Sequence, residues 1–183
     1  LPLPFTETAV NLVASRADDI AARTGRTFLL ENAACYLPDL PHEPGWDEAT
    51  FLSELCARSG CGLLLDLFNL YVNCVNFDLD VWSLLDRLPL DRVIELHIAG
   101  GETERGILLD SHSRVVPEAV WDMVDWALER APNVGALIFE VLGESFEGVG
   151  PDAYRGELVR ARAAWDRTRG GQLVGTAQSW AGP

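Results

Sequence analysis

The sequence predicts an α/β fold in which four parallel strands form about half of a (β/α) barrel of the TIM type. Short apolar runs, typical of strands buried on both faces, alternate with segments of helical periodicity. Four βα units are half of an eight-stranded barrel, which normally needs about 250 residues. Because the first helix has no strand before it, we expect the C-terminal half of a barrel over residues 1–170, followed by a loosely ordered tail at 171–183.

Capping residues and periodicity place the first elements along the chain. A helix over 6–24 begins near Thr6 and ends before Gly25. Next come a strand at 27–31, a helix at 47–59 capped by Asp47, and a strand at 62–66 after Gly60. The segment 67–78 is rich in Asn and aromatic residues, and we interpret it as a loop.

The second part of the chain repeats the same alternation. Pro117 is suited to the first turn of a helix. The expected elements are a short helix at 79–88, a strand at 92–97, an extended segment at 107–112, a helix at 117–130, a strand at 136–140 and a helix at 152–169.

Composition excludes several classes of partner. The chain has 14 Lys and Arg against 28 Asp and Glu, a net charge of −14, which argues against nucleic acid and anionic membranes. No segment has the length of a membrane span or the pattern of a signal peptide. The four cysteines lack paired CxxC spacing, so we expect buried reduced thiols and a cytoplasmic location.

Each of the four apolar runs ends in a residue that can bind a metal. These are Glu31, Asp66, His97 and Glu140. In parallel α/β folds, ligands gather at the carboxyl ends of the strands. Asp110 and His112 would join them, because residues two apart in extended backbone face the same side.

This donor set indicates a metal cluster. Carboxylate and imidazole donors without thiolate suit iron, manganese or zinc. Four carboxylates and two imidazoles exceed what one ion needs, so we expect two or more ions. Taken singly, a carboxylate at a strand end is equally consistent with a helix cap, and a histidine after an apolar strand with a core residue.

Asparagines follow two of the strands closely. Asn32, Asn69 and Asn73 could bind substrate or orient metal ligands, and Asn69 is the strongest of them because it lies three residues after Asp66. Asparagine is also an ordinary loop residue, and Asn32 and Asn73 fit that structural role better.

Several of these segments together resemble one known family, the multinuclear non-heme iron-dependent oxidative enzymes, which includes the catalytic subunit of methanobactin biosynthesis. The segments are LLEN at 29–32, LLLDLFNLYVNCVNF at 63–77, VIELHIAGG at 93–101, LLDSHS at 108–113 and VPEAVW at 116–121. The match extends from the LPLPFTETA opening to Glu140.

The resemblance implies an iron- and oxygen-dependent enzyme that modifies cysteine residues in a ribosomally made precursor peptide. It implies a cluster of two or three iron ions, and a partner protein that presents the leader of the peptide. The metal ligands implied are Glu31, Asp66, His97, Asp110, His112 and Glu140, with Asn69 close to the metals.

The chain departs from the family pattern at its N-terminal side. The family takes further histidine ligands from the first half of its barrel, and here His42 is the one histidine outside the predicted site. We therefore expect that a missing N-terminal half or a second copy completes the barrel, or that the truncated chain is inactive. The alternatives are a divalent-metal barrel isomerase or phosphodiesterase, and a degenerate half-barrel that only binds a partner.

Overall fold

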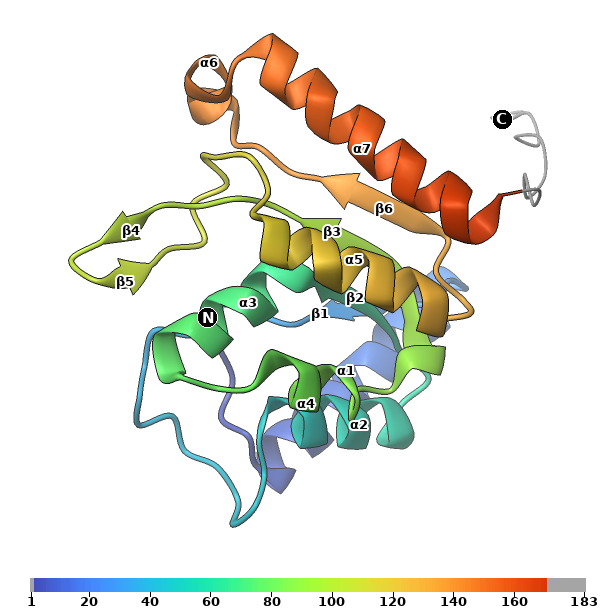
Figure 1. The fold of residues 1–183 in the computed structure, drawn as a ribbon. Coiled ribbons are helices and arrows are strands. Elements are labelled where there is room, and N and C mark those ends of the chain that lie inside the picture. The colour runs from blue at the N-terminus through green and yellow to red at the C-terminus, as the bar shows by residue number, and fades with distance from the viewer. Residues whose placement is uncertain (1, 171–183) are drawn as a thin grey trace.

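Four parallel strands, adjacent in the order β1-β2-β3-β6, form the centre of the computed structural model, which describes residues 2–170 (Figure 1). The strands are β1 (Leu29–Glu31), β2 (Gly62–Asp66), β3 (Val93–Ile98) and β6 (Ala136–Phe139), and β4 (Thr103–Glu104) and β5 (Ile107–Leu108) form a separate antiparallel hairpin. The predicted parallel α/β arrangement is confirmed. Among the described residues the sheet stays open, with β1 and β6 as its edges.

Helices connect and cover the strands. They are α1 (Glu7–Thr24), α2 (Glu48–Arg58), α3 (Leu67–Phe77), α4 (Val81–Leu85), α5 (Glu118–Arg130), α6 (Phe146–Val149) and α7 (Pro151–Arg169), with 3₁₀ turns at Leu90–Arg92 and Gly143–Ser145. Figure 1 shows α3 and α5 lying across the middle strands and α7 running along β6. The predicted tail at 171–183 lies outside the described residues.

The two faces of the sheet differ in burial. Leu63, Leu65 and Leu96 alternate along the middle strands and are fully buried against the helices in the main hydrophobic cluster. The side chains of the predicted site project from the opposite face of the sheet. On that face, Ile138 of β6 is 38% exposed. Parallel sheets are normally covered on both faces, whereas in the described residues the helices cover mainly the first face of this sheet.

The segment after β2 is a helix, and the prediction of a loop at 67–78 is wrong. The Asp66 side chain caps α3 by accepting a hydrogen bond from the Asn69 N–H at 2.8 Å, and Asp78 ends the helix in a left-handed conformation (φ 53°). Asn69, Asn73 and Asn76 recur at helical spacing, and their side chains bond to neighbouring segments instead of competing for the helix backbone.

Other predicted caps are present. Thr6 accepts from the Ala9 N–H, Gly25 ends α1 in the left-handed conformation, and Asp47 caps α2 through the Thr50 N–H. Pro117 is the residue before the first turn of α5, one position earlier than expected. All four cysteines are free and buried. None of the helices in the described part of the chain has the length and apolar character needed to cross a membrane.

Candidate metal centre

The carboxyl ends of the parallel strands place four of the predicted ligands side by side. Glu31 and Asp66 are the last residues of β1 and β2, and His97 is the direct neighbour of Asp66 in the β2–β3 register. Glu140 directly follows β6, where its N–H donates to the Ile98 carbonyl at 3.0 Å. Parallel pairing therefore sets these four side chains at one end of the sheet, as the sequence predicted.

Two groups of three side chains are close enough to hold a metal ion, with the three donor atoms of each group within 4.8 Å of one another. The first consists of Glu31, Asp66 and His97, and the second of Asp66, His112 and Glu140. Asp66 belongs to both groups. A carboxylate shared in this way can bridge two ions, each held by oxygen and nitrogen donors.

A pair of glycines lets the loop with the remaining ligands approach β3 closely. A Cβ atom at Gly100 would lie 2.1 Å from the Val115 carbonyl oxygen, and one at Gly101 would lie 1.9 Å from that of Leu109. The Gly100 carbonyl also accepts a hydrogen bond from the Ser113 N–H at 2.8 Å. Side chains at these two positions would push the loop away from the strand end, so the glycines set the position of the loop.

Asp110 and His112 lie together at the centre, although the predicted reason is wrong. The strand β5 ends at Leu108, and His112 has a left-handed backbone (φ 48°), so 107–112 is not continuously extended. Asp110 Oδ1 nevertheless lies 2.8 Å from His112 Nε2. Backbone hydrogen bonds fix the turn, since the Leu142 N–H donates to the His112 carbonyl and the Asp110 N–H to the Tyr36 hydroxyl.

Several polar atoms of the centre are buried without a hydrogen-bond partner, namely Asp66 Oδ2, Asn69 Oδ1, His97 Nδ1 and Asp110 Oδ1. His97 Nδ1 lies 3.3 Å from Glu140 Oε1, and Asp110 Oδ1 lies close to His112, yet neither contact has hydrogen-bond geometry. Buried polar groups are normally paired, and lone pairs left over in a cluster of acids fit a cation. The residues present therefore fit a bound metal.

The electrostatics of the centre also favour a cation. The pKa of Asp66 is raised to about 6, mainly by burial, and the nearby Asp110 and Glu31 carboxylates contribute to the rise. Burial is likewise the main cause that raises the pKa of Glu31. The adjacent Asp110 carboxylate raises the pKa of His112. A metal ion would reverse these effects by stabilising the charged carboxylates and the neutral imidazole.

The predicted asparagines are buried, with exposed fractions of 3% for Asn32, 5% for Asn69 and 4% for Asn73. The Asn32 side chain continues the strand pairing beyond β1, since its Oδ1 accepts from the Asp66 N–H at 2.8 Å and its Nδ2 donates to the Asp66 carbonyl at 3.0 Å. Asn69 Nδ2 donates to the Asn32 carbonyl at 3.0 Å. Asn32 and Asn69 thus position Asp66 and the end of β1.

Asn73 lies farther from the metal groups. Its Nδ2 donates to the Ala33 carbonyl at 3.1 Å and to Glu48 Oε2 at 3.0 Å, and its Oδ1 accepts from the Cys35 N–H at 2.7 Å. Burial raises the pKa of Glu48 to about 7. Nothing in the sequence indicates that Glu48 is buried, because an acid in the first turn of a helix is normally exposed.

Glu95 is a second acid that the sequence analysis did not include in the site. Its Oε1 lies 2.8 Å from His97 Nε2, two residues along β3. The sequence does allow Glu95 to be predicted near the site, because residues two apart on a strand, such as Glu95 and His97, face the same side of the sheet. His42, predicted to lie outside the site, is exposed and contacts the Glu43 carbonyl.

A cavity of about 340 Å³ opens beside the metal groups. It lies between the loop after β1 and the loop after β5, and its lining residues are Glu31, Asn32, Ala33, Ala34, Tyr36, Asn69 and Asp110. Two of the predicted ligands therefore face a space from which a substrate can reach them.

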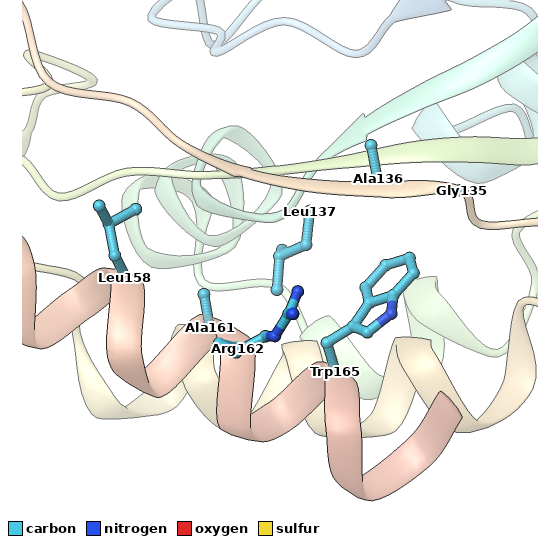
Figure 2. Close-up of a pocket in the computed structure, with 7 residues that line it drawn as sticks. All are labelled: Gly135, Ala136, Leu137, Leu158, Ala161, Arg162 and Trp165. Carbon is cyan, nitrogen blue, oxygen red and sulfur yellow. The ribbon is translucent and has the colours of Figure 1, made fainter. Parts of the chain in front are cut away.

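A second cavity, of about 420 Å³, lies between β6 and α7 (Figure 2). Leu137 and Trp165 point into it, and Arg162 is its one charged lining residue. It begins at Gly135, next to the amino end of β6, whereas Glu140 follows the carboxyl end. Among residues 2–170, no carboxylate or imidazole lines this cavity, which thus differs in chemistry from the metal groups.

Comparison with known proteins agrees with this geometry. The family model of the RiPP precursor modification enzymes MbnB/TglH/ChrH matches residues 1–141. The chain belongs to this family. The matched part contains every residue of both metal groups, and membership confirms the family resemblance that the sequence motifs indicated.

Other members of the family are longer than this chain. A UPF0276 protein of Caulobacter vibrioides is 37% identical over 178 residues, which are 95% of this chain and 60% of the relative. A UPF0276 protein of Bordetella pertussis is 41% identical over 144 residues, or 75% of this chain and 49% of the relative. One from Rhizorhabdus wittichii is 38% identical over 138 residues, again 49% of its length. The chain thus spans about half to three fifths of these relatives.

Proposed function

We propose that this chain is the metal-binding part of an enzyme that oxidises cysteine residues in a ribosomally made precursor peptide, with iron and molecular oxygen. The sharing of Asp66 by two groups of donors carries the proposal. Membership of a family of RiPP precursor modification enzymes supplies the class of substrate.

The residues divide between two ions in this proposal. Glu31, Asp66 and His97 would hold one, and Asp66, His112 and Glu140 the other, with Asp110 beside His112. Bound ferrous iron would pass electrons to molecular oxygen, and the substrate cysteine would itself supply electrons as it is oxidised.

The protein's own part is to position the ligands and to admit the peptide. Asp66 is held in place by the Asn32 side chain, which accepts from its N–H, and by the Asn69 N–H at the start of α3, which donates to its carboxylate. The cavity at Tyr36 and Asp110 gives a cysteine side chain access to the ions. We further propose that the uncovered face of the sheet is completed by an N-terminal half or a second copy, and that a separate protein presents the leader of the peptide.

Oxygen uptake tests this function. The chain is reconstituted anaerobically with ferrous iron, mixed with a cysteine-containing precursor peptide, and exposed to oxygen while uptake and peptide mass are followed. We expect uptake that depends on the peptide and a mass change confined to its cysteine residues, both abolished in Asp66→Ala. Hydrolysis or isomerisation without oxygen uptake would favour a divalent-metal isomerase or phosphodiesterase and refute the proposal.

A further inference from the structure

Glu95 and His97 form a pair on the uncovered face of β3. In the strand register Glu95 lies opposite Leu64 on β2, and His97 lies opposite Asp66. The two side chains are 26% and 10% exposed, and Glu95 Oε1 lies 2.8 Å from His97 Nε2. Glu95 belongs to neither metal group. Glu95 therefore lies two residues farther from the carboxyl end of β3 than the predicted ligand His97, and its side chain contacts that ligand.

This contact assigns different roles to the two nitrogens of His97. An ionised carboxylate can only accept a hydrogen bond, so this contact favours the form of His97 in which Nε2 carries the proton and donates to Glu95. The other nitrogen, Nδ1, is buried and has no hydrogen-bond partner. It lies on the side of Glu140, 3.3 Å from Oε1, among the acids of the metal centre. In the neutral imidazole, the free lone pair is on Nδ1.

We propose that Glu95 is a positioning residue that commits His97 to bind the metal through Nδ1. The proposal rests on the metal binding proposed above and names the ligating atom. A carboxylate on the distal nitrogen fixes the tautomer and orientation of a histidine ligand and makes it more basic. Glu31 and Asp66 offer donor atoms within 4.8 Å of a donor atom of His97, so they would hold the same ion as His97.

The tautomer of His97 can be measured without any metal. The chain has three histidines, so long-range ¹H–¹⁵N spectra of the labelled, metal-free protein at pH 8 resolve each imidazole, and His97→Asn assigns the signal. We expect His97 to carry its proton on Nε2 in the wild type. Glu95→Gln, whose amide oxygen can still accept, should keep this tautomer. Glu95→Leu should give a mixture in which Nδ1–H appears.

Metal affinity gives the second readout, with ferrous iron alone as the probe. Loss of such a partner weakens metal binding about 10- to 100-fold. We expect that loss in Glu95→Leu, a smaller one in Glu95→Gln, and none in Glu104→Leu, which removes an exposed acid from the β4–β5 hairpin. Circular dichroism of each variant confirms that it is folded, and Glu95→Gln preserves the size of the side chain.

The outcomes separate this inference from the proposed function. An Nδ1–H tautomer in the wild type, or an unchanged tautomer and affinity in Glu95→Leu, overturns the role of Glu95. A wild-type chain that has the Nε2–H tautomer but binds no iron leaves the contact intact and overturns the metal function instead, together with the ligand role of Nδ1.

Discussion

Replacing Asn32 by alanine should destabilise the protein far more than an ordinary loop substitution. Its side chain makes both hydrogen bonds to the Asp66 backbone, at 2.8 and 3.0 Å, and it is only 3% exposed. Two lost hydrogen bonds cost about 1 kcal/mol each, and a buried backbone group left unpaired costs about 1–3 kcal/mol more. We therefore expect Asn32→Ala to lower the free energy of unfolding by about 3–5 kcal/mol.

Asn76 offers a matched control for this measurement. Its side chain makes the same pair of bonds to the Leu108 backbone, both at 2.9 Å, but it is only partly buried, so water can replace them. Asn76→Ala should cost less than about 1 kcal/mol. Urea unfolding of the metal-free proteins measures both values. Equal losses in the two variants would refute the argument that burial makes the bonds of Asn32 costly.

Three further substitutions test the interior and the faces of the sheet. Burial raises the pKa of Glu48 from 4.5 to about 7, so the folded protein keeps a proton that the unfolded chain releases. The free energy of unfolding should therefore fall between about pH 4.5 and 7, by at most about 3 kcal/mol. This part of the fall should be absent from Glu48→Gln when urea unfolding is measured at a series of pH values. Leu96→Ala, on the covered face, should cost about 2–5 kcal/mol. Ile138→Ala, on the uncovered face, should cost less than about 1 kcal/mol in the same assay, and an equal cost would show that this face is covered in solution.

The strand ends could be predicted from the sequence because parallel pairing leaves little freedom. An apolar run followed by an acid or a histidine sets both the strand and the end of the sheet at which the side chain lies. Glu31, Asp66, His97 and Glu140 accordingly meet in the structure. Asp66 caps a helix and also belongs to both groups of possible metal ligands, so the cap is confirmed and the ligand role stays a prediction.

The features that escaped prediction depend on contacts between distant segments. Helix α3 was obscured by its asparagines, whose side chains bond to the ends of β1 and β5 instead of to solvent. The left-handed backbone at His112 follows from the close approach of its loop to Gly100 and Gly101, which no local pattern reveals. Glu95 is the exception, because its two-residue spacing from His97 on β3 predicts that both side chains face the same side of the sheet.

Iron content of the chain and of Asp66→Ala tests the central claim most directly. Both proteins are reconstituted anaerobically with ferrous iron, freed of excess metal and subjected to elemental analysis, with Glu104→Leu as a control. Because Asp66 belongs to both metal groups, we expect about two iron ions in the wild type and the control, and almost none in Asp66→Ala. A wild type without iron, or an Asp66→Ala variant with the same content, would contradict the account.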